Sequence, residues 1–346
     1  MAKILVTGGA GYIGSHTVVE LQNSGYEVII VDNLSNSDIQ VLDRITKITG
    51  IRPLFENIDC TDYMAMDNLF KKYSADKQDA IKAIIHFAAS KAVGESVAKP
   101  LLYYRNNLGS LMNLLQLMLT YNVKNIVFSS SCTVYGQPDR LPVTEDAPIK
   151  QPLSPYGNTK KIGEEIIRDT IYANPDYKGI ILRYFNPIGA HPSSEIGELP
   201  NGIPNNLLPF VTQTAIGLRK QLQVFGDDYN TPDGSCIRDY IHVVDLAKAH
   251  VLAVNRIVGT KSKSPVETFN LGTGRGLSVL EILKTFEKVT GVPVPFKIVA
   301  RREGDIEKVW ADPAYANEVL KWKAVETVED TLKSAWNWEL KLSQTR

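Results

Sequence analysis

The segment SPYGNTKK places a tyrosine at position 156 and a lysine at position 160, one helical turn apart. Pro155 suits a first helical turn, so Tyr156 and Lys160 should project from one face at the start of a helix. A free phenol ionises near pH ~10 and is a poor base at neutral pH, but a neighbouring ammonium favours the phenolate. The pair therefore indicates general acid–base chemistry, although Tyr-x-x-x-Lys alone carries little information and is also common as an ordinary surface pair.

A third candidate is Ser131 in FSSSCTVYG, residues 128–136, which ends a candidate strand. Doubly wound sheets bind ligands at the carboxyl ends of their strands. There Ser131 could hydrogen-bond the substrate hydroxyl on which Tyr156 acts and shuttle its proton. A serine-rich strand end by itself would indicate only a turn.

The stretch VTGGAGYIGS follows the first candidate strand and opens the first candidate helix. Its glycines at 8, 9, 11 and 14 provide a tight turn, a close approach of backbone to a pyrophosphate, and close packing of helix on strand. The helix N-terminus then offers free N–H groups to the phosphates. Asp32 ends the second strand, where a carboxylate can bind both adenosine ribose hydroxyls and repel a 2′-phosphate. The pattern predicts NAD rather than NADP as cofactor.

The elements that would position these residues can be read from the hydrophobic pattern. Short apolar runs alternate with longer amphipathic stretches, and several runs are continuously apolar, as in strands covered by helices on both faces. This predicts an α/β fold with a doubly wound parallel sheet of the Rossmann type. The expected strands are 3–7, 27–31, 53–59, 83–88, 125–130 and 179–185, and the expected helices are 12–24, 63–73, 101–121 and 156–173.

After Asn186 the regular alternation of apolar runs and amphipathic stretches ends. Prolines and glycines up to about residue 205 indicate a loop, and a helix at about 206–219 and a strand at 223–226 follow. We expect two lobes with a cleft between them. The NAD-binding Rossmann domain should hold residues 1–186 and about 239–271, and a smaller, discontinuous α/β substrate lobe should hold about 187–238 and 272–346.

Composition argues against several kinds of partner. Lysine plus arginine and aspartate plus glutamate each total 38 in 346 residues, so no global field attracts nucleic acid or an anionic membrane. No apolar run approaches the ~18 residues that span a bilayer, and MAKILVTGG leaves no room for a signal peptide. The cysteines (Cys60, Cys132 and Cys236) lack metal-ligand spacing, so we expect no metal site and a reducing, cytoplasmic location.

Ten motifs spread over nearly the whole chain resemble the extended short-chain dehydrogenase/reductases, and most closely the UDP-glucose (UDP-galactose) 4-epimerase family. One such motif is weak, but ten in the family's order are specific. They are TGGAGYIGS, VDNLSNS, HFAASKAVGES, SSSCTVYG, SPYGNTK, LRYFNPIGAHPS, GIPNNLLPF, DGSCIRDYIHVVDLA, FNLGTGRG and RREGD.

The resemblance implies that Tyr156 is the catalytic base, that Lys160 tunes it and that Ser131 assists. It also implies NAD as cofactor, with Lys91 and Asn106 beside the nicotinamide ribose and the sugar. The positions that match cofactor contacts are Gly8, Gly11, Tyr12, Ile13, Gly14, Asp32, Asn33, Asn36, Asp59, Cys60, Phe87, Ala88, Ala89, Lys91, Asn106, Ser129, Tyr156, Lys160 and Phe185.

The resemblance further implies a UDP-sugar substrate. Arg238 and Arg302 would bind the diphosphate, Asp305 the uridine ribose, and Phe225 would lie beside the uracil. A forked guanidinium suits phosphate oxygens, although by sequence alone either arginine could instead be paired or solvated. The other matching positions are Lys91, Ser131, Thr133, Tyr156, Asn186, Asn206, Leu207, Gln223 and Val309.

The implied reaction is a reversible inversion at carbon 4 of the sugar, through a 4-keto intermediate and transient NADH. In the family, the residue four positions after the one matching Asp305 gates the space near the C2 substituent. A large aromatic residue there restricts the enzyme to glucose and galactose. Because Val309 is small, the resemblance implies that UDP-N-acetylglucosamine and UDP-N-acetylgalactosamine are accepted as well.

Three other functions are conceivable for a chain with these motifs. A nucleotide-sugar 4,6-dehydratase would need an Asp-Glu pair directly after Ser131, where this chain has Cys132 and Thr133. A UDP-glucuronate 4-epimerase differs only in a contact to C6 and stays open. A non-catalytic NAD-sensing protein would be expected to lose Tyr156 or Lys160, and both are present.

The segment LLYYRNNLGSLMNLLQLMLTY, residues 101–121, carries more apolar side chains than one core face can use, and the helix 156–173 is similar. The resemblance implies that both helices pair across a two-fold axis into the four-helix bundle of a homodimer. The second lobe could instead cover the spare apolar face.

Overall fold

The chain forms alternating strands and helices in the computed structural model, which describes residues 2–76, 80–302 and 305–344. Positions 303 and 304 of RREGD, and the domain ends at 1 and 345–346, lie outside the described residues.

The strands are β1 (Lys3–Thr7), β2 (Glu27–Val31), β3 (Leu54–Glu56), β4 (Ile81–His86), β5 (Asn125–Ser131), β6 (Lys178–Tyr184), β7 (Asn186–Ile188), β8 (Leu222–Phe225), β9 (Ile237–His242), β10 (Val266–Leu271), β11 (Gly276–Ser278), β12 (Phe296–Val299) and β13 (Lys308–Val309). The helices are α1 (Tyr12–Asn23), α2 (Val41–Thr49), α3 (Tyr63–Ser74), α4 (Val93–Ala98), α5 (Pro100–Tyr103), α6 (Gly109–Tyr121), α7 (Pro155–Ala173), α8 (Leu207–Ala215), α9 (Val243–Val258), α10 (Val279–Thr290), α11 (Ala314–Val319) and α12 (Val328–Ser343), with a π-helical turn η1 (Tyr104–Leu108) and a 3₁₀ turn η2 (Cys132–Tyr135).

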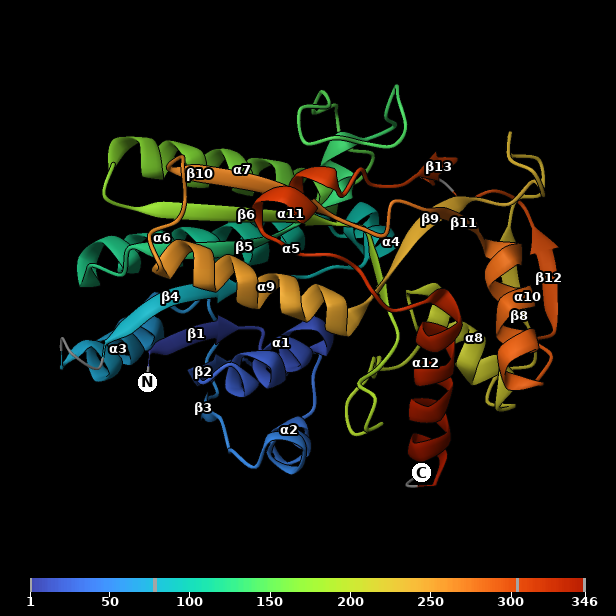
Figure 1. The fold of residues 1–346 in the computed structure, drawn as a ribbon, viewed down its shortest axis with the longest axis horizontal. Helices are drawn as coiled ribbons and strands as arrows, with labels where there is room; N and C mark the ends of the chain where they lie inside the picture. Colours follow the sequence, from blue (N-terminus) through green and yellow to red (C-terminus); the bar gives the residue numbers. More distant parts are fainter. Residues whose placement is uncertain (1, 77–79, 303–304, 345–346) are drawn as a thin grey trace.

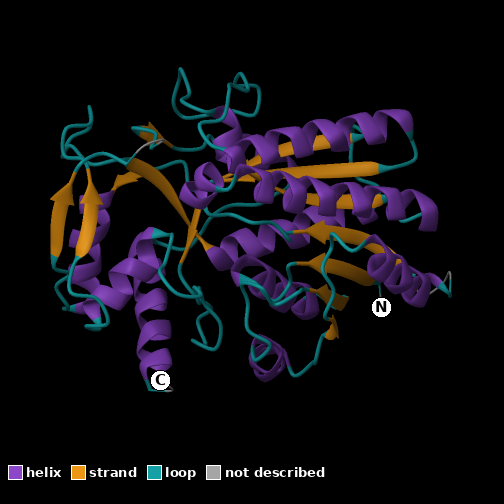
Figure 2. Cartoon of the chain, turned by 180° about the vertical axis from the view of Figure 1, so that it is seen from behind, coloured by secondary structure: helices purple, strands orange, loops and turns teal. Residues whose placement is uncertain are grey.

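The larger sheet has seven parallel strands in the order β10-β6-β5-β4-β1-β2-β3. Helices α1 and α9 cover one face, and α3, α6 and α7 cover the other (Figures 1 and 2). Successive side chains of β1 enter the two layers in turn, with Ile4 and Val6 on the α1 side and Leu5 on the α6 side. The predicted doubly wound sheet is confirmed, and the strand order reverses between β1 and β4, where such sheets open a ligand crevice.

The smaller lobe is built around β9, which pairs with β7, β11 and β13. Helices α8, α10 and α12 and the two-stranded β8–β12 sheet enclose its core, which includes Val211, Phe286 and Leu332. The chain returns to the larger sheet through α9, which packs on α1, and through β10. Because β9 pairs in the smaller sheet and α9 packs on the larger one, the chain crosses between lobes here, and the domain limits at about 239 and 271 remain a prediction.

Several expected elements differ in detail from those observed; β4, for example, spans Ile81–His86 where a strand over 83–88 was expected, and α8 ends at Ala215 rather than at about 219. The helix expected over 101–121 is interrupted by the π-helical turn η1, a feature that often marks functional positions. The strand expected over 53–59 is limited to β3, since β3 lies at the sheet edge and its pairing stops at Glu56, opposite the last residue of β2. No helix within the described ranges is both long enough and apolar enough to cross a bilayer.

Candidate active site

The point where the strand order reverses opens into a cavity of about 910 Å³ between the two lobes. Its walls come from the loop after β1, the ends of β2, β4 and β5, the start of α7, and the 196–206 loop with α12. Of the positions that the sequence predicted for NAD, all but Phe185 line this cavity. They are Gly8, Gly11, Tyr12, Ile13, Gly14, Asp32, Asn33, Asn36, Asp59, Cys60, Phe87, Ala88, Ala89, Lys91, Asn106, Ser129, Tyr156 and Lys160.

The glycine loop has no room for side chains at two positions. Gly8 has a φ of +69°, and a Cβ there would lie 2.7 Å from the backbone nitrogen of Ala88. A Cβ on Gly14 would overlap the carbonyl oxygen of Gly8 and approach Gly9 Cα to 2.8 Å. The N-cap residue of α1, Gly11, supplies no side-chain cap, and the first turn of this helix lines the cavity. The loop therefore fits a dinucleotide pyrophosphate.

The carboxylate of Asp32 is fixed at the cavity wall by three hydrogen bonds. Its Oδ2 accepts from the backbone N–H of Ala10 (3.1 Å), and its Oδ1 accepts from the N–H of Leu34 (3.0 Å) and the hydroxyl of Ser37 (2.8 Å). These bonds tie the end of β2 to the glycine loop. The same bonds hold the two carboxylate oxygens of Asp32 where the hydroxyl groups of an adenosine ribose could donate hydrogen bonds to them.

Tyr156 and Lys160 face the cavity from the first turns of α7. Ser154 caps this helix by accepting from the N–H of Gly157 (3.2 Å). The Lys160 ammonium donates to the backbone oxygen of Ser129 (2.7 Å) and lies 5.9 Å from the centroid of the Tyr156 ring. The helix start and the end of β5 together hold the predicted pair in one place.

Burial moves the pKa values of these two groups in opposite directions, that of the phenol upward and that of the ammonium downward. Desolvation raises the pKa of Tyr156 to about 12, and a hydrogen bond with Ser131 opposes the rise. Desolvation lowers the pKa of Lys160 to about 8, and the Glu164 carboxylate opposes the fall. Because burial alone keeps the phenol protonated, additional positive charge in the cavity is needed to make Tyr156 a base near neutral pH.

The end of β5 supplies further polar groups. Ser131 caps η2 by accepting from the N–H of Thr133 (3.2 Å). The Thr133 hydroxyl oxygen is buried and has no hydrogen-bond partner within the described part of the chain. A buried hydroxyl without a partner is costly, so this position suits a polar ligand that would complete it.

The predicted UDP-binding residues form a second cluster in the smaller lobe. Arg302 donates twice to the Asp305 carboxylate (2.7 and 3.2 Å) and lies 5.5 Å from the centroid of the Phe225 ring. Arg238 lies 3.8 Å from the same carboxylate. Its charge also lowers the pKa of the Cys132 thiol, against the dominant effect of burial, so the cluster lies near the end of β5. These residues do not line the cavity described above.

Two other predicted residues contact the carboxylate of Glu198, and a third, Asn106, bonds elsewhere in the cavity wall. Lys91 approaches Glu198 to 3.4 Å, and Asn206 donates to it at 2.6 Å. Asn106, in the π-helical turn, donates to the hydroxyl of Ser90 (3.1 Å). Lys91 comes from the larger lobe and Asn206 from the smaller one, so Glu198 joins the two across the cavity.

The remaining predicted positions lie outside the cavity lining. Phe185 packs with Val309 in a buried cluster, and Leu207 packs against the core of the smaller lobe. Asn186 pairs in β7, and Gln223 is exposed on β8. Ser131 and Thr133, at the end of β5, are also outside the lining. The structure thus gathers Tyr156, Lys160 and most cofactor positions in one cavity, and it places the third predicted catalytic residue, Ser131, beside that lining rather than in it.

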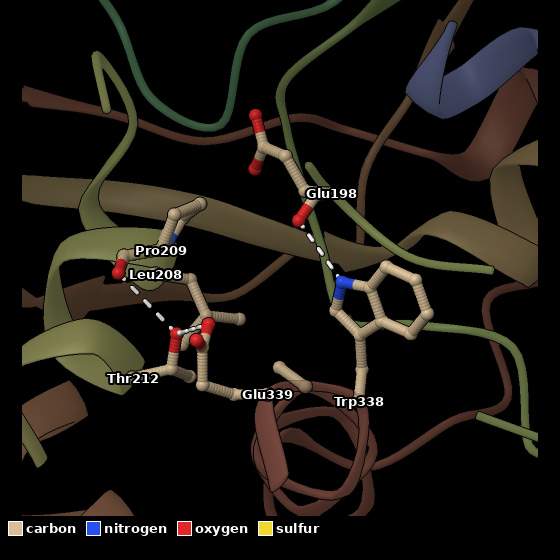
Figure 3. A pocket seen from close by; sticks show the side chains of 8 residues that line it. Glu198, Leu208, Pro209, Thr212, Trp338 and Glu339 are labelled. Carbon is tan, nitrogen blue, oxygen red and sulfur yellow. Dashed lines mark hydrogen bonds between the residues drawn. The ribbon is translucent and has the colours of Figure 1, made fainter. Parts of the chain in front are cut away.

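Sequence reasoning missed the residues that close the cavity from the second lobe. Trp338 on α12 lines the cavity and donates to the backbone oxygen of Glu198 (3.0 Å; Figure 3). Three residues before Glu198, the Glu195 carboxylate pairs with Lys47 of α2 (2.5 Å) and Lys341 of α12 (2.6 Å). A proline-rich loop and a helix near the C-terminus have no pattern that would have identified these contacts.

Comparison with known proteins gives a consistent result. Residues 5–335 match the family model described as GDP-mannose 4,6 dehydratase. The chain is 52% identical to the UDP-glucose 4-epimerase of Bacillus subtilis over 336 residues, which cover 97% of this chain and 96% of that protein. It is similar to the crystal structure of UDP-glucose 4-epimerase from Bifidobacterium longum with NAD⁺ and UDP (48% identity, TM-score 0.94, all of both chains). It is equally similar to the enzyme from Stenotrophomonas maltophila with NAD and formylated UDP-arabinopyranose (47% identity, TM-score 0.94, all of both chains).

Proposed function

The chain belongs to the UDP-glucose 4-epimerase family within the extended short-chain dehydrogenase/reductases, and on that premise we propose that it interconverts UDP-glucose and UDP-galactose with NAD as its cofactor. One observation carries the proposal. The glycine loop and the Tyr156–Lys160 pair line the same cavity. The loop can therefore bind the pyrophosphate of NAD while the pair transfers a proton of a sugar bound beside the same cofactor.

The residues around the cavity fit NAD. The bare backbone at Gly8 and Gly14 would receive the pyrophosphate, and Asp32 would accept hydrogen bonds from the adenosine ribose. Lys91 and Asn106 are assigned to the nicotinamide ribose and the sugar. When bound, NAD supplies an acceptor that takes the hydride from carbon 4 and returns it, so the overall reaction involves no net oxidation.

The proton transfers are assigned to the end of α7. Tyr156 as phenolate removes the proton of the sugar 4-hydroxyl, and it gives the same proton back once the 4-keto sugar presents its opposite face. The Lys160 ammonium stabilises the phenolate, and Ser131 hydrogen-bonds the reacting oxygen. Arg238 and Arg302 hold the diphosphate while the hexose turns, so binding energy from an unreacting part keeps the ketone in place.

The residues after Ser131 argue against dehydration, the reaction in the description of the matched family model. Elimination of water across C5–C6 needs an acid and a base, and this chain offers Cys132 and Thr133 there. Burial raises the pKa of the Cys132 thiol to about 12, so it stays protonated at neutral pH. Neither side chain can act as the base of an elimination.

The range of sugars is assigned to Val309. This residue is buried at the end of β13, opposite Arg238 in the β9 register, and packs near Phe185. We expect Val309→Tyr to reduce turnover of UDP-N-acetylgalactosamine by roughly 10²-fold while turnover of UDP-galactose is largely kept, because the larger ring fills the space for the C2 substituent. Turnover of both sugars should be measured together with the melting temperature, with Val309→Ile as the control for packing. If a folded Val309→Tyr protein loses both activities to the same extent, Val309 does not select between the two sugars.

The assembly and location are proposed as well. Exposed apolar side chains gather on the α5–α6 segment and α7, among them Leu101, Met112 and Tyr172. We assign these surfaces to a four-helix bundle in a homodimer. The free cysteines at 60, 132 and 236 suit a cytoplasmic location.

The direct test is incubation of the purified protein with UDP-galactose, and separately with UDP-N-acetylgalactosamine, without added cofactor. We expect UDP-glucose and UDP-N-acetylglucosamine as products, with no net accumulation of NADH, because the cofactor is regenerated in each cycle. Net NADH would indicate a dehydrogenase instead. A 4-keto-6-deoxy product would indicate a dehydratase.

A further inference from the structure

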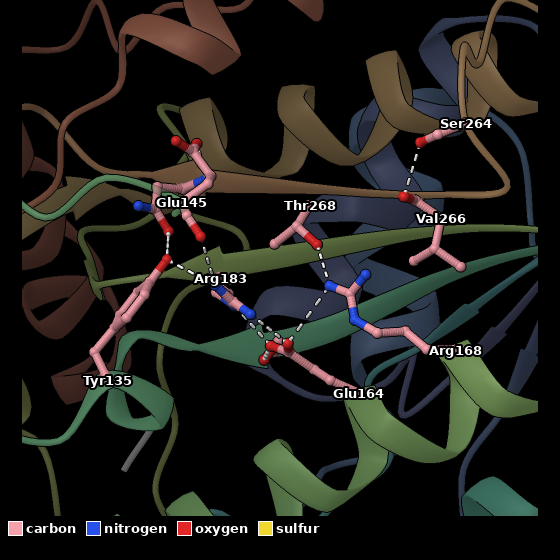
Figure 4. Close-up of polar contacts among 10 residues, drawn as sticks. Tyr135, Glu145, Glu164, Arg168, Arg183, Ser264, Val266 and Thr268 are labelled. Atoms are coloured by element: carbon pink, nitrogen blue, oxygen red, sulfur yellow. Dashed lines mark hydrogen bonds and ion pairs between the residues drawn. The ribbon is translucent and has the colours of Figure 1, made fainter. Parts of the chain in front are cut away.

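Glu164 of α7 and Arg183 of β6 form a buried ion pair (Figure 4). The Glu164 carboxylate is 4% exposed and accepts from the hydroxyl of Ser130 (2.6 Å) and from Nε and Nη2 of Arg183 (2.8 and 2.6 Å). Arg168 approaches it to 4.0 Å. Arg183 is itself held by the hydroxyl of Tyr135, which accepts from Nη1 (2.9 Å). The carboxylate therefore has a fixed position and a full set of partners.

This position is one helical turn beyond Lys160 on α7, on the same face. Lys160 and Glu164 are bonded to consecutive residues of β5, the first to the backbone oxygen of Ser129 and the second to the side chain of Ser130. The Lys160 ammonium also lies 5.0 Å above the centroid of the Phe128 ring. The lysine and the glutamate thus clamp the helix to the strand end that carries Ser131.

Close packing of α7 on the sheet makes these bonds possible. Gly163 lies between the two residues, and a Cβ there would come 2.9 Å from Phe128 Cζ. A larger residue would push the helix away from β5. Because helix and strand pack closely, the Lys160 ammonium and the Glu164 carboxylate are both buried between α7 and β5. Charges interact more strongly in such a low-dielectric interior than in water.

The charged and titratable groups around Lys160 come from several elements. Glu164 is the nearby charge that favours its ammonium form, while desolvation lowers its pKa to about 8. His86 on β4 is fully buried with a pKa lowered to about 3, first by desolvation and then by the lysine, so it is neutral. Tyr156 on α7 lies 5.9 Å from the ammonium, measured to the ring centroid, and is itself faced by Tyr103 of α5, Tyr184 of β6 and Cys132 of η2. Arg168 of α7 and Arg183 of β6 face the carboxylate of Glu164.

We propose that Glu164 is a positioning residue for this reaction: held by Arg183 and Ser130, its carboxylate fixes α7 on the end of β5 and keeps Lys160 charged and directed toward the cavity. The proposal rests on the proposed epimerase function. Glu164 lies two turns beyond Tyr156, about 12 Å along the helix, and acts on the tyrosine through the lysine.

The test is the pH dependence of the NAD-bound enzyme with Glu164→Gln. The ammonium form of Lys160 is present below its pKa and is lost as the pH rises through it, so turnover falls on the alkaline side. Removing the carboxylate lowers the pKa of Lys160 further. We expect the alkaline limb of kcat to move to lower pH by roughly one unit, because a nearby charge has been removed. Glu164→Asp keeps the charge and should lie closer to the wild type.

A second readout does not depend on turnover. The near-ultraviolet absorbance of tyrosinate, taken as the difference between a protein and its Tyr156→Phe counterpart, follows ionisation of Tyr156. In the Glu164→Gln background this ionisation should require a higher pH than in the wild type, since a lysine that has lost its charge no longer stabilises the phenolate. If the wild type fails to epimerise, the proposed function is wrong, and this titration alone decides the role of Glu164.

The matched control is Glu267→Gln. Glu267 on β10 is also nearly fully buried and accepts from Nε and Nη2 of Arg256 (2.6 and 2.7 Å). Neither glutamate lines the cavity, but the arginine that holds Glu267 lies on α9, whereas Glu164 lies on α7 one turn from Lys160. Both substitutions should lower the melting temperature, and only Glu164→Gln should move the kcat limb and the tyrosinate titration. If neither moves in a folded Glu164→Gln protein, or if Glu267→Gln moves them equally, the role of Glu164 is only structural and the proposal is overturned.

Discussion

Tyr156→Phe is expected to slow the turnover of UDP-galactose by about 10³-fold, within the range of general acid–base catalysis. The substitution removes the phenolic oxygen and leaves the ring that packs at the start of α7. NAD content and UDP affinity should therefore stay near those of the wild type. Product separation measures the rate, and calorimetry with UDP measures the affinity.

The chain offers a control on the same helix. Tyr172 is 90% exposed at the far end of α7, so Tyr172→Phe removes the same atom at a distance from the cavity. We expect unchanged turnover for this variant. Undiminished activity of Tyr156→Phe would contradict the assignment of the base and with it the mechanism.

Gly14→Ala is expected to yield protein without bound cofactor. Its new methyl group would overlap the carbonyl oxygen of Gly8 and crowd Gly9 Cα, so the loop must move out of the conformation that receives a pyrophosphate. Overpacking of this kind costs about 1–3 kcal/mol of folding stability. NAD affinity should fall by at least about 10²-fold, which corresponds to losing ~2.7 kcal/mol of binding free energy.

The ratio of NAD to protein after purification and the melting temperature measure both effects. Gly94→Ala is the control, because a Cβ at this position in α4 meets nothing within 4 Å among the described residues. That variant should keep its NAD and gain up to about 1 kcal/mol of stability, since alanine favours a helix over glycine. A Gly14→Ala protein with a full complement of NAD would show that the loop does not cradle the phosphates.

Much of the larger lobe followed from local patterns in the sequence. The bounds of β1 and β2 agree with the expected strands, because continuous apolar runs between polar turns identify buried parallel strands. The start of α7 was also predictable, since Ser154 and Pro155 are typical of a helix N-terminus. These signals predict that Tyr156 and Lys160 lie on one face at the start of the helix, and both line the cavity in the structure.

The contacts that close and support the site could not be predicted in this way. Arg183 reads as one polar residue in an apolar strand, and nothing local indicates its bidentate pair with Glu164 nineteen positions earlier. Glu198 lies in an irregular loop, and its partners Lys91 and Asn206 come from both lobes. Such pairs depend on tertiary packing, which periodicity and turn chemistry do not encode.

Glu195 fastens α2 of one lobe to α12 of the other through two lysines whose side chains reach water. The Glu195 carboxylate is itself largely buried, but both lysine ammonium groups are open to dissolved ions, and salt weakens such attractions with a screening length of ~8 Å at physiological ionic strength. The residues that follow Glu195 wall the cavity. The link that Glu195 makes between α2 and α12 is therefore stronger at low ionic strength than at high, so the hold of one lobe on the other beside the cavity depends on the surrounding electrolyte.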